Sequence, residues 1–476
     1  MSTGLRLSGL GIRHAGQKVL DDVSLDIRAG ESLCLVGASG GGKSLIAAAV
    51  AGMLPACMAA VGQVHLGGEV RQASDHHGLR ALWNRELCLL PQEPAAALAP
   101  LLRAIDQIRL DRPRLSLPAA LQVLSRFGLD RRAAGRFPGE LSGGMAQRLL
   151  AALVARSEAG VLIVDEPTKG LDPSRRADIA AMLESLRAAG RALLVITHDL
   201  DLVRALGGCL GVLDDGSIAE NGPTEQLLAS PQSRFLRACL AAEPRHWRIN
   251  RKMEFGDSVA VADQLVIARK QRKLAGPLSF NLKQGQITAM LGASGVGKTT
   301  LGDTLLGLER AAAGEVSWFS RRLDPPLRRS FRRRFQKLHQ DPTTVFPANR
   351  TFGDGLEDLH RLMGDGVALR SDALLEQLRV SRDLLARRPG EVSGGEAQRL
   401  ALVRLLAVQP ALLVADEPCS RLDMPTQAET LLLLRSLADE TELSVLLITH
   451  DKPAAAALAD KQLVIAAAGR FAVETE

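Results

Sequence analysis

The chain alternates between short apolar runs and segments with helical spacing. Residues Ser32–Val36, Val161–Val164 and Ala192–Ile196 are almost wholly apolar, as expected for strands that are buried on both faces of a sheet. Helical patterns follow Lys43 and Gly144. This order of strands and helices predicts an α/β domain with a mainly parallel sheet.

The same pattern occurs twice, with an offset of about 250 residues between the copies. The duplication predicts a first domain at residues 1–245, a short linker at 246–252 and a second domain at 253–476. The recurring segments are GASGGGKS at 37–44 and GASGVGKT at 292–299, LSGGMAQR at 141–148 and VSGGEAQR at 392–399, VLIVDEP at 161–167 and LLVADEP at 412–418, and LLVITHD at 193–199 and VLLITHD at 445–451.

Composition narrows the class of protein. The 476 residues are 46% hydrophobic and 24% charged, enough for large buried cores. The formal charge of +6 suits nucleotide or an anionic surface and does not require nucleic acid. The six cysteines include no C-x-x-C spacing, which favours a reducing compartment over a disulfide framework or a zinc site.

The longest apolar stretch, Leu45–Val61, directly follows a glycine-rich loop and contains Pro55. This context predicts a buried helix and its exit turn, and we expect no membrane span in the chain itself. The N-terminal residues have no apolar core of signal-peptide length. If the protein works at a membrane, other chains must supply the spanning helices.

Two glycine-rich loops each follow an apolar strand and precede a helix. Glycines let backbone N–H groups turn toward phosphate oxygens, and the N-terminus of the helix favours an anion. We expect a lysine of each loop to reach the β- and γ-phosphates of ATP and the next hydroxyl to bind Mg²⁺. The candidate residues are Gly37, Ser39, Gly40, Gly42, Lys43 and Ser44 in the first loop, and Gly292, Ser294, Gly295, Gly297, Lys298 and Thr299 in the second.

An Asp-Glu pair ends one apolar strand in each copy, as Asp165-Glu166 and Asp416-Glu417. A carboxylate at a strand end beside the phosphate loop can hold Mg²⁺ through water, and the next residue can polarise the attacking water as general base. The alternative for either pair alone is a solvated turn. Their position between the phosphate loop and a repeated Thr-His-Asp favours catalysis.

A Ser-Gly-Gly motif precedes a helical pattern in each copy. Such a helix start can bind an anion, or it can be a simple helix cap. Within one domain the glycine-rich loop already binds the phosphates of ATP. We therefore expect the anion at this motif to belong to an ATP that is bound to the other domain. The residues are Ser142, Gly143 and Gly144 in the first copy, and Ser393, Gly394 and Gly395 in the second.

This set of motifs resembles that of the ABC ATPases over nearly the whole chain. The resemblance implies two tandem P-loop nucleotide-binding domains, each an α/β, RecA-like core with a helical subdomain, packed head to tail around ATP and Mg²⁺. It implies one ATP between Lys43, Ser44, Asp165, Glu166 and His198 and the Ser393–Gly395 motif. The other ATP would lie between Lys298, Thr299, Asp416, Glu417 and His450 and the Ser142–Gly144 motif.

The resemblance extends to further residues. His198 and His450 look like the histidines that contact the γ-phosphate. Gln92 and Gln340 match the family's glutamine that touches Mg²⁺ and the attacking water, and Asp172 and Asp423 match the loop that links the two sites.

The segments PQEP at 91–94 and HQDP at 339–342 resemble the dipeptide, oligopeptide and nickel importer ATPases, as does SPQSRFLRACLAAEP at 230–244. This implies the energy-coupling subunit of an importer for peptide, nickel or a metal chelate. Its partners would be two integral-membrane permease subunits, docked near residues 95–140 and 345–391, and a solute-binding protein. The chain would be cytoplasmic and peripheral on the inner membrane, with no nucleic acid bound.

The chain departs from that subfamily in several places. The cysteine cluster often found near the C-terminus of that subfamily is missing. Residues 168–172 and 419–423 differ from the usual Ser-Ala-Leu-Asp, a segment that in the family links the two ATP sites. His14 aligns with the aromatic residue that stacks on adenine, whereas the second copy has Arg269 nearby.

Two other functions are compatible with the motifs. One is a tandem ATPase acting on ribosomes or nucleic acid, although such proteins usually carry a long charged helical linker or a coiled-coil insertion. The other is an accessory ATPase of a multi-subunit enzyme resembling the phosphonate-degrading complex.

A basic run lies before Gln340. It could bind nucleic acid or anionic lipid, or it could form a solvated helix with two phenylalanines on one face, four residues apart. The run comprises Arg328, Arg329, Arg332, Arg333, Arg334 and Lys337, with Phe331 and Phe335.

Overall fold

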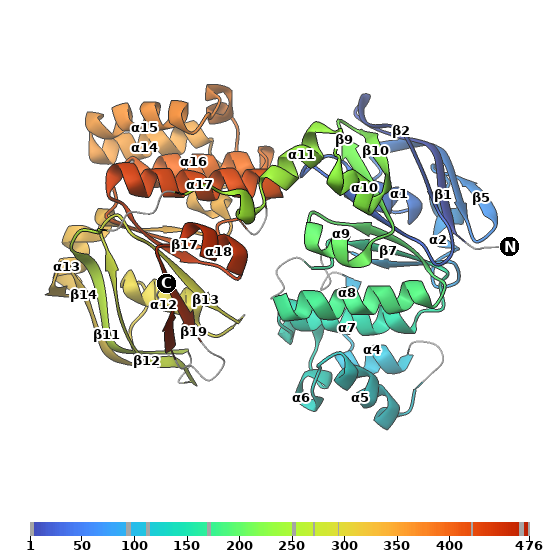
Figure 1. Ribbon diagram of the computed structural model, residues 1–476, viewed down its shortest axis with the longest axis horizontal. Coiled ribbons are helices and arrows are strands. Elements are labelled where there is room, and N and C mark those ends of the chain that lie inside the picture. The colour runs from blue at the N-terminus through green and yellow to red at the C-terminus, as the bar shows by residue number, and fades with distance from the viewer. Residues whose placement is uncertain are drawn as a thin grey trace. The chain divides into compact units, whose positions relative to one another are not determined.

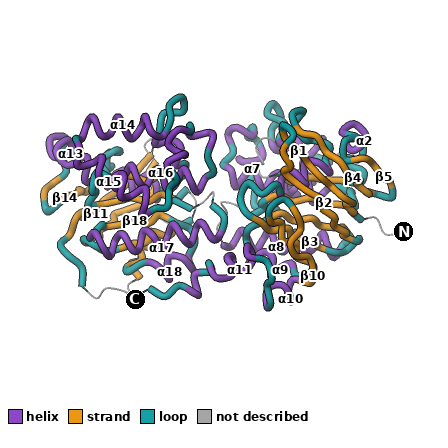
Figure 2. The backbone as a smooth tube through the Cα atoms, turned by 90° about the horizontal axis from the view of Figure 1, so that it is seen from above, coloured by secondary structure: helices purple, strands orange, loops and turns teal. Residues whose placement is uncertain are grey.

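The computed structural model describes residues 4–91, 97–110, 115–168, 173–249, 254–269, 272–293, 295–419, 422–465 and 471–474. The chain divides into two compact units, Met1–Leu240 and Ala241–Glu476. Each unit is built of both strands and helices (Figures 1 and 2). Of the predicted linker the structure describes His246 to Ile249, of which Trp247 and Ile249 pack against the apolar core of the second unit.

The first unit contains an antiparallel sheet of order β2-β1-β4-β5 and a six-stranded sheet of order β10-β9-β3-β8-β7-β6. In the larger sheet only β10 runs antiparallel to its neighbour. The strands are β1 (Leu5–His14), β2 (Gln17–Ile27), β3 (Ser32–Gly37), β4 (Met58–Leu66), β5 (Glu69–Gln72), β6 (Leu87–Leu90), β7 (Val161–Asp165), β8 (Ala192–Ile196), β9 (Cys209–Asp214) and β10 (Ser217–Pro223).

The helices of the first unit form two groups. Figure 1 shows α4, α5 and α6 beyond α7, away from the strands, as a helical part of the unit. The helices are α1 (Lys43–Val50), α2 (His76–Arg80), α4 (Ala104–Leu110), α5 (Leu117–Arg126), α6 (Arg131–Ala134), η1 (Pro138–Glu140), α7 (Gly143–Arg156), α8 (Pro173–Ala188), α9 (Leu200–Leu206), α10 (Thr224–Ala229) and α11 (Arg234–Ala241).

The second unit repeats both sheets, in the orders β12-β11-β14-β15 and β16-β17-β18-β13-β19-β20. Its larger sheet is parallel except for the edge strand β20. The strands are β11 (Ser258–Arg269), β12 (Arg272–Lys283), β13 (Ile287–Gly292), β14 (Ala313–Trp318), β15 (Arg321–Arg322), β16 (Phe335–Leu338), β17 (Leu412–Asp416), β18 (Ser444–Ile448), β19 (Lys461–Ile465) and β20 (Phe471–Glu474).

The helical part of the second unit is built on α14 and α15, which contact each other and α16 (Figure 1). The repeated arrangement confirms the predicted fold class. The helices are η2 (Pro244–His246), α12 (Lys298–Leu305), α13 (Pro325–Phe331), η3 (Arg332–Arg334), η4 (Pro342–Val345), α14 (Phe352–Met363), α15 (Asp365–Gln377), η5 (Arg382–Ala386), η6 (Pro389–Glu391), α16 (Gly394–Leu406), α17 (Met424–Thr441) and α18 (Lys452–Leu458).

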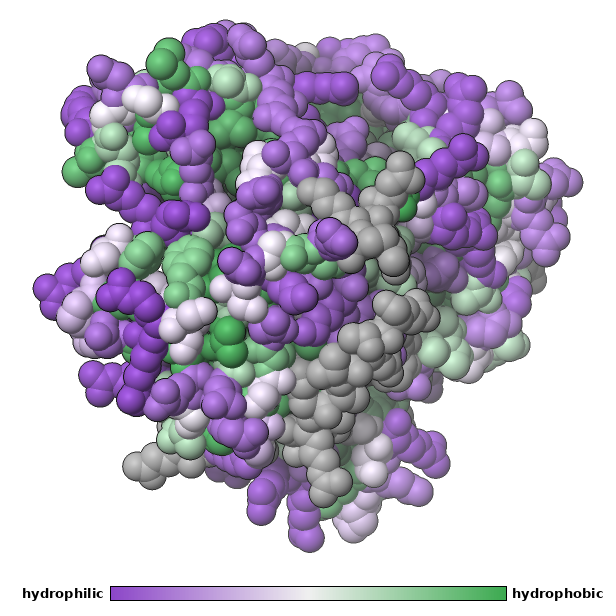
Figure 3. All heavy atoms as spheres, turned by 60° about the vertical axis from the view of Figure 1, so that its left-hand side comes forward, coloured by the Kyte–Doolittle hydropathy of each residue, from purple (hydrophilic) through white to green (hydrophobic). Residues whose placement is uncertain are grey.

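The predicted strands are confirmed. All residues of β3, β7 and β8 are buried, because both faces of the parallel sheet are covered, one of them by α1 and the smaller antiparallel sheet. The apolar stretch Leu45–Val61 falls on α1, a turn and the start of β4. Within the part of the chain that the structure describes, no helix is both long and apolar enough to cross a bilayer. Figure 3 shows mostly polar residues on the face it presents, with smaller apolar areas among them.

The prediction of one helix for the basic run is wrong. Helix α13 ends at Phe331, and Phe335 begins strand β16, which pairs with β17 at the edge of the sheet. Phe335 is buried and stacks on Trp318 with ring centroids 3.8 Å apart. Strand pairing and this aromatic contact outweigh the local preference for a helix. The five arginines of the run remain exposed, whereas Lys337 turns inward.

Candidate nucleotide sites

The first glycine-rich loop joins the end of β3 to the start of α1. Gly42 precedes the helix with φ 94°, and a Cβ there would lie 2.7 Å from Leu20 Cδ2, so both the backbone and the space require glycine. Lys43 is buried, and its Nζ donates to the carbonyl oxygens of Gly37 at 2.7 Å and Ala38 at 2.8 Å. The ammonium group is therefore held across the loop.

The second loop repeats this geometry between β13 and α12. Gly297 has φ 105°, and a Cβ there would lie 2.8 Å from Ile267 Cδ1. Lys298 Nζ donates to the carbonyl oxygens of Gly292 at 2.7 Å and Ala293 at 3.2 Å. Ser294 lies outside the described residues. Both loops present a lysine ammonium and a helix N-terminus, which together suit phosphate.

The predicted general bases directly follow β7 and β17. Glu166 has φ 52° and Glu417 has φ 48°, both in the left-handed region. Their N–H groups donate at 2.9 Å to the carbonyl oxygens of Ile196 and Ile448, at the ends of the neighbouring strands. These bonds fix each carboxylate at the carboxyl edge of its sheet, where ligands bind in open α/β folds.

The structure brings each predicted base together with its predicted histidine. His198 Nδ1 lies 2.7 Å from Glu166 Oε2, and His450 Nδ1 lies 2.8 Å from Glu417 Oε2. The Glu166 side chain is only 10% exposed. Each pair spans two adjacent parallel strands, so the repeated Asp-Glu and Thr-His motifs converge within one unit.

The described residues include ligands that suit Mg²⁺. Thr299 Oγ1 donates to Asp416 Oδ1 at 3.2 Å, which sets a hydroxyl and a carboxylate side by side, as this hard cation requires. Ser44 and Asp165 occupy the corresponding places at the start of α1 and the end of β7. In the described ranges, no three His, Cys, Asp or Glu side chains gather as a metal site.

Of the two predicted glutamines, only Gln340 lies among the described residues. Gln340 is exposed on the loop that follows β16, immediately before η4. Gln92 lies outside the described residues. Asp172 is outside them too, whereas Asp423 caps α17 by accepting a hydrogen bond from the Thr426 N–H at 3.1 Å.

Each Ser-Gly-Gly motif forms an exposed helix start. Ser142 Oγ accepts from the Met145 N–H at 3.4 Å before α7, and Ser393 Oγ accepts from the Glu396 N–H at 3.3 Å before α16. The Glu396 carboxylate also accepts from the Ser393 N–H at 2.8 Å, which completes a capping box and lowers the pKa of Glu396. Both starts are thus ordered by their own caps.

The sequence analysis missed one charged group beside the second site. Lys337 Nζ lies 2.7 Å from Asp303 Oδ1 and 3.4 Å from Asp416 Oδ2. A lysine at the position where the first copy has Leu89 is the signal that could have found it.

Comparison with known proteins agrees with this geometry. Residues 20–169 and 275–420 match the family described as ABC transporter. The chain is 32% identical to the peptidoglycan transport ATP-binding protein YejF of Agrobacterium fabrum, over 94% of the chain and 87% of the relative. It is 30% identical to the glutathione import ATP-binding protein GsiA of Salmonella choleraesuis, over 94% and 82%.

Among solved structures, RNase-L Inhibitor superposes with a TM-score of 0.65 at 20% identity, covering 95% of this chain and 87% of that one. This likeness shows the tandem fold alone. The sequence relatives and the family match cover both repeats. The two phosphate loops with their strand-end carboxylates thus place the chain in the ABC transporter family, as a tandem ATP-binding protein whose ATPase activity is coupled to transport.

Proposed function

We propose that this protein is the energy-coupling ATPase of an importer for peptide-like solutes, with domains at residues 1–245 and 253–476 and two composite ATP sites. The importer assignment is supported by relatives named for import of glutathione and transport of peptidoglycan. Both named solutes contain amino acids in amide linkage. The observation that carries the ATPase assignment is the pairing of Glu166 with His198 and of Glu417 with His450 at the sheet edge.

In the proposed mechanism, Lys43 and Lys298 bind the β- and γ-phosphates, with the N-termini of α1 and α12 behind them. Bound Mg²⁺ would neutralise part of the phosphate charge. Ser44 and Asp165 would hold it in one site, and Thr299 and Asp416 in the other. Gln92 and Gln340 would lie adjacent to these ligands. Glu166 and Glu417 accept the proton of the attacking water.

Two further contacts complete each proposed site. His198 and His450 orient these glutamates and contact the γ-phosphate. The Ser142–Gly144 motif closes over the ATP of the second loop, and the Ser393–Gly395 motif closes over the ATP of the first. Closure around ATP and reopening after hydrolysis would drive the permeases.

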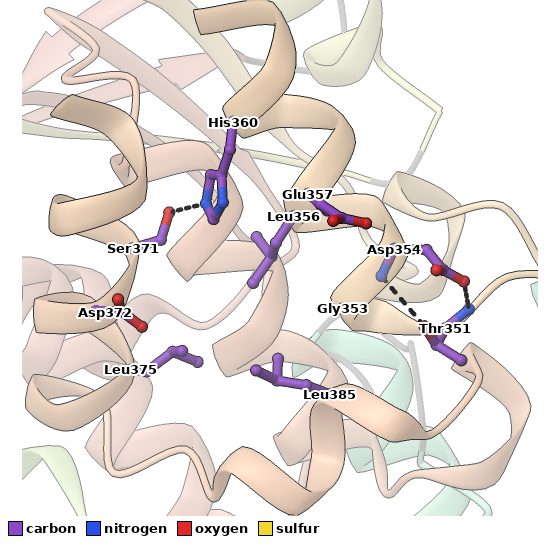
Figure 4. A pocket seen from close by; sticks show the side chains of 10 residues that line it. All are labelled: Thr351, Gly353, Asp354, Leu356, Glu357, His360, Ser371, Asp372, Leu375 and Leu385. Atoms are coloured by element: carbon purple, nitrogen blue, oxygen red, sulfur yellow. Dashed lines mark hydrogen bonds between the residues drawn. The ribbon is translucent and has the colours of Figure 1, made fainter. Parts of the chain in front are cut away.

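A pocket supports partner docking on the helical part of the second unit. It has a volume of 380 Å³ and lies between α14, α15 and η5, within the predicted docking segment 345–391. Figure 4 shows Leu356, Leu375 and Leu385 pointing into it, with Thr351 and Asp354 hydrogen-bonded to one another at its side. We propose that a permease subunit docks on this helical part, near residues 345–391.

Affinity purification of the tagged full chain from its native membrane tests the function. The Glu166→Gln, Glu417→Gln double variant should retain ATP and hold the domains closed, because both general bases are removed. We expect two polytopic membrane proteins to co-purify in stoichiometric amounts, and the associated binding protein to bind peptides rather than nickel. The same chain with Lys43→Ala and Lys298→Ala, which cannot bind ATP, is the control. Recovery of ribosomes or of a soluble enzyme complex in place of permeases contradicts the proposal.

A further inference from the structure

An ion pair lies next to Asp416, the carboxylate proposed to bind the metal ion at the second ATP site. The Lys337 ammonium lies 2.7 Å from Asp303 Oδ1 and 3.4 Å from Asp416 Oδ2. The other oxygen of the same carboxylate, Asp416 Oδ1, accepts the Thr299 hydroxyl at 3.2 Å. The side chains of Lys337 and Asp416 are only 9% and 10% exposed, so salt screens this interaction much less than a surface pair.

The first unit lacks this pair at the corresponding positions. Lys337 pairs with Val414 across the β16–β17 ladder, and Leu89 pairs with Ile163 across the β6–β7 ladder. Val414 and Ile163 each lie two residues before the strand-end aspartate of their unit, so Lys337 corresponds to Leu89.

Asp303 corresponds to Ala48, because each lies five residues after its phosphate-loop lysine. A cation and an anion in the second unit therefore replace two apolar residues of the first. The net charge is unchanged, but a cation now lies beside the proposed metal ligand Asp416.

The contact has an electrostatic consequence for any cation that Asp416 holds. An ammonium within 4 Å neutralises part of the negative charge of the carboxylate and repels a metal ion bound to it. Asp303 offsets part of that repulsion, but the positive member of the pair is the one that contacts Asp416. Lys337 acts through Asp416 and is therefore a positioning residue.

We propose that the Lys337–Asp303 pair weakens divalent-cation binding at the second ATP site, so that the two sites of one chain differ in their dependence on Mg²⁺. The proposal rests on the ATP sites proposed above. It predicts that the metal ion increases the affinity for nucleotide less at the second site than at the first.

The test measures binding of the fluorescent analogue mant-ATP to the full chain, with Mn²⁺ and with EDTA. Lys43→Ala removes the first site and Glu417→Gln prevents hydrolysis at the second. In this parent, the ratio of the Kd in EDTA to the Kd in Mn²⁺ reports the contribution of the metal. Adding Asp303→Ala and Lys337→Leu copies the first site, and the ratio should rise about threefold to tenfold. Lys337→Arg keeps the positive charge and should leave the ratio near that of the parent.

A reciprocal variant tests the same idea while Lys337 and Asp303 stay in place. Ala48→Asp with Leu89→Lys, in a chain carrying Lys298→Ala and Glu166→Gln, should lower the ratio at the first site. An unchanged ratio in a folded Asp303→Ala, Lys337→Leu chain overturns the proposal, because a purely structural role alters both Kd values together. If that chain does not fold, an unchanged ratio in the reciprocal variant overturns it. Failure of the unaltered chain to bind mant-ATP at all would instead contradict the proposed ATP sites.

Discussion

At the scale of single residues, the proposed bases occupy a costly backbone conformation. A left-handed φ costs a non-glycine residue about 1 kcal/mol, and Glu166 and Glu417 both adopt it. The N–H bonds to Ile196 and Ile448 hold them there. Each glutamate is therefore directed to its histidine by the sheet itself, before any nucleotide binds.

Cysteine reactivity is a prediction at the same scale. Burial raises the pKa of the Cys34 thiol to about 12 and also raises the pKa of Cys419, whereas Cys57 is exposed. Because only the thiolate reacts, a maleimide at pH 8 should label Cys57 in the native protein and reach Cys34 and Cys419 only in urea. Peptide mass spectrometry of the labelled chain checks this.

Cys57→Ser is the control for that experiment and should abolish the fast native labelling. Equal native rates for Cys57 and Cys419 would contradict the burial of Cys419.

At the scale of elements, a buried arginine joins a helix to the sheet of the second unit. Arg435 of α17 is 5% exposed and contacts Asp460 Oδ2 at 2.7 Å, and the same oxygen accepts the Ile287 N–H of β13 at 2.8 Å. Asp460 immediately precedes β19. One carboxylate thus fixes α17 against two adjacent strands.

Removing this carboxylate should destabilise the second unit. Asp460→Ala removes one of the two carboxylates that pair with the buried Arg435 guanidinium and leaves Asp439, and we expect a loss of about 3 kcal/mol in the free energy of unfolding. Urea unfolding followed by fluorescence, to which buried Trp318 contributes, measures it. Glu429→Ala breaks the exposed pair with Arg399 and should cost less than about 1 kcal/mol. Equal losses for both variants would contradict the role given to Asp460.

The sequence predicts regular elements better than it predicts such contacts. The strands β3, β7 and β8 follow from apolar runs, and the start of α1 follows from its glycine-rich loop. The Arg435–Asp460 and Lys337–Asp416 contacts join residues far apart in the chain, and no periodicity relates them. The same limit explains the error over Phe335, because the strand and the tryptophan that pair with it lie elsewhere in the sequence.

At the scale of the whole molecule, the proposed composite sites require each unit to complete the other. Lys43 and Ser393 would then serve one ATP, and Lys298 and Ser142 the other. Two substitutions in the same site should reduce ATPase activity no further than one, because the first already disables that site. Substitutions in different sites should have additive effects.

Steady-state ATP hydrolysis by four full-length chains tests this arrangement. Lys43→Ala with Ser393→Arg should be about as active as Lys43→Ala alone. Lys43→Ala with Ser142→Arg should lose most of the remaining activity, because both sites are disabled. Ser142→Arg alone completes the set and checks that this substitution leaves one site working. The opposite ranking of the two double variants would assign each Ser-Gly-Gly motif to the ATP of its own unit.

The join between the two units also bears on how the protein can evolve. When two copies of one gene product pair, every mutation appears in both halves of the pair at once. Here both repeats lie in one chain, so a mutation can alter one half and spare the other. Leu89 and Ala48 in the first repeat, against Lys337 and Asp303 in the second, are a difference of this kind. Selection can thus specialise one half without altering the other.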